Sequence, residues 1–372
     1  MPAIDAMTAP AVTLRGIDSF HVGGSVRTLS GLPVEQRVLA QGAAARPVDP
    51  NGDHMSGQMY CQAYRLAQPR HPLPILLWHG GGMTGANWET TPDGRPGWLW
   101  RFLQAGYDVV VSDAVERGRS SWSRYPDIYA SEPIFRTLNE AWDMFRLGPA
   151  QGYTTHAGER IAFPGQQFPL PYFDQFAKQW VPRWAGHEAI TSDAYDALIE
   201  RIGPCIVVGH SQGGGFAMLA AQRQAARVRA VVTLEPSGAP AFDAAMTAPR
   251  PPHLTVWGDT IRSHPVWQRY HATVGSYGAA VRATGARSDV LDLPQEGIAG
   301  NSHFLMMDLN SDVIFRRVAA WLENAVPAGR LDENVVDKDV MDEDAMDKYL
   351  IDRDVMDQDL ADRKGPDRNT HD

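Results

Sequence analysis

The sequence has no uninterrupted apolar run of about 18 or more residues, the length that a membrane-spanning helix needs. We therefore predict a protein without a membrane span. Cysteine is also scarce, since the chain has only Cys61 and Cys205, each within an apolar, strand-like stretch. Such cysteines are more often buried free thiols than partners in a disulfide. No cysteine or histidine cluster has the spacing of a metal site, so we predict no bound metal.

Two further kinds of signal are missing. The first residues, MPAIDAMTAPAVTLRG, have neither the basic start nor the apolar stretch of a secretory signal, which predicts a cytoplasmic protein. If a signal has been removed, the protein would instead be secreted or periplasmic. The glycine run at 80–82 lacks the G-x-G-x-x-G spacing of a dinucleotide site, and no phosphate-binding lysine follows it. We predict no cofactor.

Charge is distributed unevenly along the chain. The formal net charge is −10, but residues 331–372 hold 15 acidic and 6 basic side chains, so the other 330 residues carry only −1. This nearly neutral body has no basic stripe of the kind that binds nucleic acid, and we predict no nucleic-acid partner. A homodimer is left open as the assembly.

The acidic tail is built on a five-residue repeat. Apolar pairs separated by aspartate-rich triplets recur at Val340-Met341, Ala345-Met346, Leu350-Ile351, Val355-Met356 and Leu360-Ala361. With about 3.6 residues per helical turn these pairs would spiral around a helix, and on a strand successive pairs would face opposite sides. The segment therefore cannot bury one apolar face, and we expect residues 331–372 to be disordered. Calcium binding is disfavoured, because no glycine turn and no closing glutamate complete an EF-hand loop.

Before the tail, strand patterns alternate with helical ones. An entry strand at 12–14 is expected to lead to a turn at Gly23-Gly24. Apolar or alternating runs typical of strands occur at 57–64, 74–78, 106–112, 205–208, 228–234, 253–257 and 290–293. Helical patterns fall at 98–104, 216–226, 267–274 and 313–322. This alternation predicts an α/β fold with a mostly parallel central sheet and helices on both faces.

One connection is much longer than a single crossover helix requires. Residues 121–198, between the strands at 106–112 and 205–208, are rich in Trp, Tyr, Phe and Pro. We interpret them as a helical cap inserted over the site, with some aromatic side chains lining the substrate cleft. An ordinary helical layer with a small core of its own would account for most of the same aromatics. We therefore expect one catalytic domain at 1–330, which includes the cap, and the tail at 331–372.

A pentapeptide at 209–213, Gly-His-Ser-Gln-Gly, organises the chain. It follows the apolar run at 205–208 and precedes a helix rich in small residues, so Ser211 lies at the apex of a strand–turn–helix unit. A nucleophile elbow needs this pattern, because only small neighbours let the strand and the helix approach so closely. G-x-S-x-G alone is a weak pattern, and the alternative is a serine in a tight turn. The setting favours Ser211 as a catalytic nucleophile.

A serine nucleophile needs a base, an acid that orients the base, and an oxyanion hole. We predict His303 as the base, because it lies in a glycine-containing loop between the last strand and the final helix. Two carboxylates compete as the acid. Asp259 follows the later strand, where most hydrolases of this architecture place the acid, and Glu235 ends an otherwise apolar strand. The residues alone do not decide between them, and the one not used would be a helix or loop cap.

The oxyanion hole requires two N–H groups that converge on the substrate oxygen. We expect one from Gln212, the residue after the nucleophile, and the other from Gly81, which lies in a glycine run after the strand at 74–78. A generic strand-to-helix turn would explain the same glycines without any functional role. A serine at the elbow, rather than a carboxylate, excludes the haloalkane dehalogenase and epoxide hydrolase chemistries of this scaffold.

The chain resembles the α/β-hydrolase fold from about residue 10 to residue 328. More narrowly, it is similar to a small group of bacterial serine esterases with a Ser-His-Glu triad, whose structurally known member has two adjacent cysteines at the oxyanion hole. The most specific strings are W-E-T-T-P-D-G-R at 88–95 and G-N-S-H at 300–303. Gly81 and Gly82 stand where that member has its cysteine pair, so no vicinal disulfide can form. The acidic repeat tail has no recognised counterpart in the group.

The resemblance also implies roles for individual residues. In this group the acid is the glutamate after the earlier strand, which favours Glu235 over Asp259. Matched by position, the implied site consists of a nucleophile, a base, an acid and two oxyanion donors: Ser211, His303, Glu235, Gly81 and Gln212.

We therefore expect a carboxylesterase-type serine hydrolase that acts through an acyl-enzyme on a medium-sized, partly apolar ester or lactone. A lactonase, thioesterase, amidase or acyltransferase would use the same triad, and no sequence feature separates these activities. A non-catalytic ligand-binding member of the fold would normally have lost a triad residue or the oxyanion glycines. All of these residues are present here.

Overall fold

The computed structural model describes residues 11–246 and 248–326. Its main sheet has the strand order β1-β4-β6-β5-β7-β8-β9-β10. The strands are β1 (Leu14–Leu29), β4 (Gly52–Leu66), β5 (Ile75–Trp78), β6 (Val109–Asp113), β7 (Cys205–His210), β8 (Val228–Leu234), β9 (His253–Trp257) and β10 (Ser288–Asp292). Strand β4 pairs antiparallel with β1 and β6, and all other neighbours in this sheet are parallel. A second, small antiparallel sheet joins β2 (Glu35–Arg37) to β3 (Arg46–Val48).

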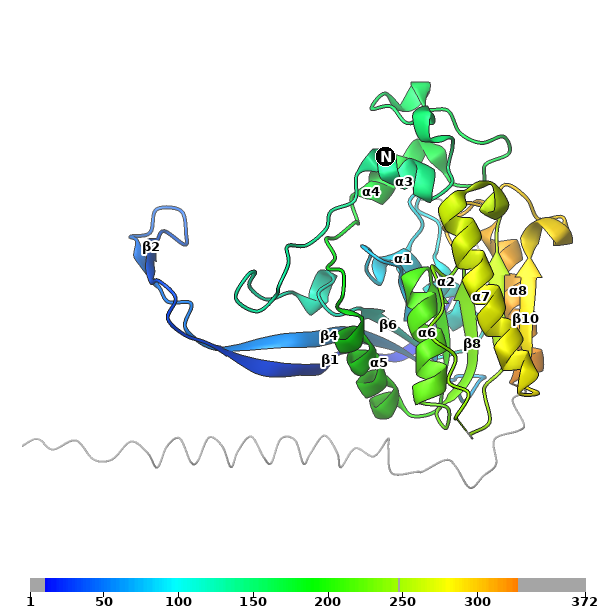
Figure 1. Ribbon diagram of the computed structural model, residues 1–372, viewed down its shortest axis with the longest axis horizontal. Coiled ribbons are helices and arrows are strands. Elements are labelled where there is room, and N and C mark those ends of the chain that lie inside the picture. The colour runs from blue at the N-terminus through cyan, green and yellow to red at the C-terminus, as the bar shows by residue number, and fades with distance from the viewer. Residues whose placement is uncertain (1–10, 247, 327–372) are drawn as a thin grey trace, which may run out of the picture. The chain divides into compact units, whose positions relative to one another are not determined.

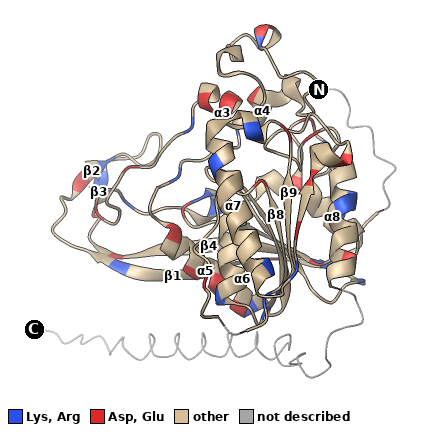
Figure 2. Ribbon diagram, turned by 45° about the vertical axis from the view of Figure 1, so that its right-hand side comes forward, with Lys and Arg blue, Asp and Glu red and all other residues tan. Residues whose placement is uncertain are grey.

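Helices cover both faces of the main sheet. On one face lie α5 (Glu188–Ile202), α6 (Gln212–Arg223) and α7 (Pro265–Ala283), and on the other lie α2 (Trp98–Gln104) and α8 (Ser311–Ala325) (Figures 1 and 2). Helices α2 and α8 pack through their aromatic side chains, with the ring centroids of Phe102 and Phe315 4.9 Å apart. The predicted α/β fold with a mostly parallel sheet is confirmed.

The central strands form where the sequence has continuous apolar runs. Every residue of β5, β6 and β7 is buried, as expected for parallel strands covered on both faces. The runs at 228–234 and 253–257 become β8 and β9 with the expected bounds. Cys61 in β4 and Cys205 in β7 are both buried and free, as predicted, and burial raises the pKa of each thiol to about 12.

The turn predicted at Gly23-Gly24 is wrong, because β1 continues through both glycines to Leu29 and pairs with β4 along its length. Both glycines have positive φ angles, 65° and 85°, so the strand bends there without reversing. A Cβ atom on Gly23 would lie 3.2 Å from Ala194 in α5. The glycine pair therefore lets the long hairpin pass close over α5, and its outer end carries the β2–β3 sheet beyond the helices (Figure 1).

The long connection at 121–198 contains two short helices, α3 (Leu138–Met144) and α4 (Phe173–Ala177), beyond the ends of the parallel strands (Figure 1). Several of its aromatic side chains form a small core of their own and are fully buried: Trp142, Phe168, Phe173 and Phe176. Its last part belongs to α5, which packs against β1, β4 and α6, with Tyr195 stacked 3.8 Å from Trp78. The segment over the strand ends is therefore shorter than the whole insertion.

The acidic repeat tail predicted at 331–372 lies outside the described residues. Among the residues that are described, no helix is both long and apolar enough to cross a membrane. The short helix α1 (Ala86–Glu89) follows the glycine run after β5 and completes the set of elements around the site.

Candidate active site

Ser211 lies in the tight turn between β7 and α6. Its backbone has φ 54° and ψ −117°, a conformation that costs a non-glycine residue energy and is typical of a nucleophile elbow. The neighbouring glycines allow this turn, because a Cβ atom on Gly209 would lie 2.4 Å from the Gly213 carbonyl oxygen. A Cβ atom on Gly213 would lie 2.6 Å from the carbonyl oxygen of His79. The strand–turn–helix expected from the pentapeptide is therefore formed with Ser211 at its apex.

The backbone of Ser211 is fixed on both sides. Its N–H donates to the Leu234 carbonyl oxygen at 3.0 Å, and its own carbonyl oxygen accepts from the Ser237 N–H at 3.1 Å. The side chain is less constrained, since its hydroxyl forms no hydrogen bond to any described residue, His303 included. Such a bond is often long or misaligned until a substrate is bound.

His303 lies in the loop that precedes α8, and its imidazole is buried. Ring nitrogen Nδ1 lies 2.9 Å from Oε2 of Glu235. Because the carboxylate accepts, Nδ1 carries the hydrogen and Nε2 keeps a lone pair, which is the form a general base needs. The backbone N–H of His303 donates to the Phe145 carbonyl oxygen at 3.0 Å. The ring is therefore fixed in orientation by one side-chain and one main-chain contact.

Glu235 directly follows β8 and is fully buried. Its φ angle of 45° turns the chain at the strand end, and its backbone N–H donates to the Val256 carbonyl oxygen of β9. Besides His303, the carboxylate accepts from the Gly258 N–H at 2.8 Å and from Nη2 of Arg146 at 2.5 and 2.6 Å. Burial raises the pKa of this carboxyl above its usual value, and the Arg146 charge opposes that rise.

Asp259, the rival acid, lies after β9 but does not contact the imidazole. Its Oδ2 accepts from the Asn301 backbone N–H at 2.8 Å, so it caps the loop that carries His303. Of the two carboxylates that the sequence could not separate, the structure thus places Glu235 on the imidazole and Asp259 on the loop.

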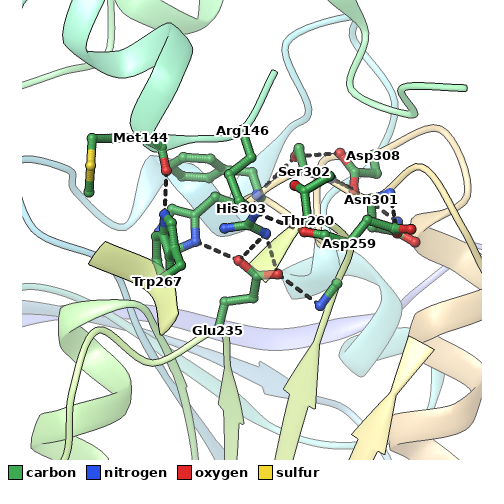
Figure 3. A network of polar contacts seen from close by, with 12 residues as sticks. Met144, Arg146, Glu235, Asp259, Thr260, Trp267, Asn301, Ser302, His303 and Asp308 are labelled. Atoms are coloured by element: carbon green, nitrogen blue, oxygen red, sulfur yellow. Dashed lines mark hydrogen bonds and ion pairs between the residues drawn. The ribbon is translucent and has the colours of Figure 1, made fainter. Parts of the chain in front are cut away.

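Arg146 was not predicted from the sequence, although its guanidinium contacts both carboxylate oxygens of Glu235 (Figure 3). It comes from the residue run after α3 and is 1% exposed. Its Nε donates to the Asp259 carbonyl oxygen at 2.9 Å, and its guanidinium lies 4.8 Å from the ring centroid of Trp267. An arginine within an aromatic-rich insertion gives no periodic signal, so only its long-range contact identifies it.

A small polar network supports the base loop from the other side (Figure 3). Asp308 is fully buried and accepts from the Ser302 hydroxyl at 2.6 Å, the Ser302 N–H at 2.9 Å and the Asn301 side-chain amide at 2.9 Å. Burial raises the pKa of Asp308 to about 7. The network holds Asn301 and Ser302, the two residues before His303. The loop that carries His303 is therefore fixed by side-chain hydrogen bonds.

The side chain of His210, the residue before Ser211, contacts the backbone of His303. Its Nε2 donates to the His303 carbonyl oxygen at 2.8 Å, and the two ring centroids are 4.5 Å apart. Burial and the neighbouring His303 lower the pKa of His210 well below its usual value. His210 is therefore a neutral positioning residue, a role the sequence alone did not suggest.

Of the two predicted oxyanion donors, Gly81 lies in the loop after β5 and Gln212 is the first residue of α6. Within the described chain, no acceptor is bonded to the backbone N–H of Gly81 or of Gln212. The glycine run is held by His79, whose Nδ1 donates to the Gly80 carbonyl oxygen at 2.8 Å while its Nε2 accepts from the Ala114 N–H at 2.9 Å. Burial lowers the pKa of His79 to about 4, so this residue remains a neutral clamp on the glycine run.

A cavity of about 360 Å³ is lined by Arg146, Asp259, Gly300 and residues 163–167 among others. Its lining includes neither Ser211 nor His303. We therefore do not assign this cavity to the group that reacts with the serine.

Known proteins resemble this chain in sequence and in fold. The sequence pattern of the alpha/beta hydrolase fold family matches residues 74–270. A probable secreted lipase, phiG, of a fungal species (strain ATCC 74256) is 29% identical over 334 residues, which cover 73% of this chain and 87% of that protein. The solved structure of a novel bacterial esterase is 28% identical, with a TM-score of 0.73 over 85% of this chain and 98% of its own.

The contact between Glu235 and His303 predicts which carboxylate matters. Glu235→Gln should slow the reaction of Ser211 with a fluorophosphonate roughly 100-fold or more, because an amide does not hold the imidazole in the basic form or stabilise its charge. Asp259→Asn keeps an acceptor for the Asn301 N–H and should slow it less than about 10-fold. The second-order labelling rate measures both, with thermal melting as the folding control. If Asp259→Asn proves the crippling change, Asp259 is the acid.

Arg146 predicts a pH dependence. Burial and the charges of Arg146 and Arg136 hold the pKa of His303 well below its usual value, so labelling of Ser211 should persist well below pH 6.5. Arg146→Met removes one of those charges, so the pKa of His303 should rise. The acidic limb of the pH profile of the labelling rate should therefore move to higher pH, and the rate itself should fall. Arg146→Lys keeps the charge without the planar fork, so the limb should stay near that of the natural protein while the rate falls. An unshifted limb in a folded Arg146→Met variant would contradict this role.

Proposed function

The chain belongs to the alpha/beta hydrolase fold family and is an esterase- or lipase-like hydrolase, and from this premise we propose that it is a serine carboxylic ester hydrolase. The observation that carries the proposal is the 2.9 Å contact of His303 Nδ1 with Glu235, made next to a strained serine turn. A buried imidazole oriented in this way serves as a base for a hydroxyl nucleophile.

The proposed reaction gives each of these groups one role. Nε2 of His303 takes the proton of Ser211 while Oγ attacks the ester carbonyl carbon, and the N–H groups of Gly81 and Gln212 hold the oxygen as it becomes negative. The intermediate collapses, and His303 returns the proton to the leaving alcohol. The acyl group is then bonded to Ser211, and a water activated by His303 releases it as the acid. Glu235 stabilises the imidazolium during both steps.

The surroundings of the base favour a partly apolar substrate. Phe145 lies in contact with the His303 ring, with centroids 5.7 Å apart, and Trp267 lies 4.3 Å away on another side. Both side chains are buried, so water around the base is restricted. These aromatics support a medium-sized ester or lactone with an apolar part.

Two predictions from the sequence concern the protein outside its active site. The fungal relative is named as a secreted lipase, so the cytoplasmic location of this chain stays a prediction. The homodimer is likewise untested. Neither changes the reaction assigned to the site.

Replacing the nucleophile tests the function. Ser211→Ala should lower the hydrolysis of medium-chain 4-nitrophenyl esters by at least about a thousandfold, because it removes the atom that forms the acyl-enzyme. Ser276→Ala, whose hydroxyl bonds the Ala272 carbonyl oxygen on the surface of α7, serves as the matched control. Initial rates of nitrophenol release measure both variants. Turnover by Ser211→Ala equal to that of the natural protein would refute the proposal.

A further inference from the structure

Arg183 reaches the oxyanion loop from the inserted segment. Its backbone is fixed by a pair of hydrogen bonds with Ile134, one of 3.0 Å from its own N–H and one of 2.6 Å to its carbonyl oxygen. Two residues earlier, the Val181 N–H donates to the Gly82 carbonyl oxygen at 3.0 Å. The insertion is thus anchored directly to the glycine run, and Arg183 is held at that anchor.

The guanidinium of Arg183 occupies the space that a side chain at position 81 would need. A Cβ atom on Gly81 would lie 2.5 Å from Nη1 of Arg183 and 2.9 Å from Oε1 of Gln212. The guanidinium therefore lies beside both residues that are expected to supply oxyanion donors. A larger residue at 81 would have to displace this guanidinium.

The guanidinium of Arg183 has no oppositely charged partner among the described residues. No carboxylate or other acceptor among the described residues forms an ion pair or a hydrogen bond with its guanidinium. Two acids that act on the neighbouring arginines have partners of their own: Glu140 pairs with Arg136 at 2.6 Å, and Glu116 contacts His187 at 2.8 Å. An unpaired, half-buried guanidinium beside an apolar site is a place where an anion gains most from binding.

Arg117 and Arg136 lie within electrostatic range of Arg183, and each of them also has an acid close to it. Burial lowers the pKa of Arg117 and of Arg136, the charges of Glu116 and Glu140 respectively oppose that fall, and the charge of Arg183 lowers both pKa values further.

We propose that Arg183 binds a carboxylate of the substrate next to the scissile ester, so that the substrate class is an ester or lactone that bears an acid group. This inference rests on the proposed hydrolase function and specifies it. A carboxylate fits the planar fork of arginine with two parallel hydrogen bonds, and the apolar rest of the substrate meets the aromatic side chains around His303. Arg183 selects the substrate and is not required to move a proton.

A matched pair of esters tests the assignment. Mono-4-nitrophenyl adipate and 4-nitrophenyl hexanoate have acyl chains of equal length and differ in a terminal carboxylate. Arg183→Gln should lower the ratio of their kcat/KM values, charged over neutral, by roughly 10- to 100-fold, as expected for the loss of a charged hydrogen bond. Arg183→Lys should give an intermediate ratio, because it keeps the charge and loses the fork. Arg124→Gln, which removes an ion-paired charge from the same insertion, should leave the ratio unchanged.

Two outcomes would overturn the inference. An unchanged ratio of the two kcat/KM values in Arg183→Gln would show that Arg183 does not bind the carboxylate of the substrate. An equal fall for both esters, confined to kcat, would place Arg183 on the reacting oxygen instead.

A binding measurement separates this inference from the hydrolase function. Calorimetry with adipate on Ser211→Ala should show binding that is lost in the Ser211→Ala, Arg183→Gln double variant. Arg183-dependent binding without hydrolysis of either ester would support the carboxylate site and refute the hydrolase. Hydrolysis of both esters with adipate binding that is absent, or indifferent to Arg183, would refute the carboxylate site and leave the hydrolase intact.

Discussion

The buried carboxylate of Glu235 is the point where separate parts of the chain meet. It receives the imidazole of His303 from the base loop, the guanidinium of Arg146 from the insertion, and the Gly258 N–H from the end of β9. A fully buried charge is tolerated only when it is paired and hydrogen-bonded, and removing one partner typically costs roughly 3–5 kcal/mol. The folding of the insertion is thus coupled to the formation of the triad, since Arg146 must be in place for the acid to be stable.

The insertion therefore supplies side chains to the candidate active site. The Phe145 carbonyl oxygen accepts a hydrogen bond from the His303 backbone N–H, and Arg146 pairs with Glu235. Arg183 lies against the glycine run at Gly81. The same segment positions the base, the acid and the charge that we assign to substrate selection. A change in the insertion is expected to alter rate and specificity together.

Sequence reasoning reached the parts of the molecule that leave local signals. Continuous apolar runs identified β8 and β9, and small residues around Ser211 identified the elbow, because both features are dictated by close packing. The turn predicted at Gly23-Gly24 was wrong, because glycine permits a bend within a strand as readily as a turn. Arg146 and Arg183 left no signal at all, because each acts through a contact with a residue far away in the chain. Residue types alone also could not separate Glu235 from Asp259, which both follow strands at the same edge of the sheet.

The crystal structure of the protein after reaction with a phosphonate ester tests the central claim most directly, because the adduct mimics the tetrahedral intermediate on the serine. We expect a phosphorus bonded to Oγ of Ser211, with one phosphonyl oxygen about 2.7–3.1 Å from the N–H groups of both Gly81 and Gln212. The contact between His303 and Glu235 should be retained. An adduct on another residue, or a phosphonyl oxygen that faces away from the glycine run, would contradict the account.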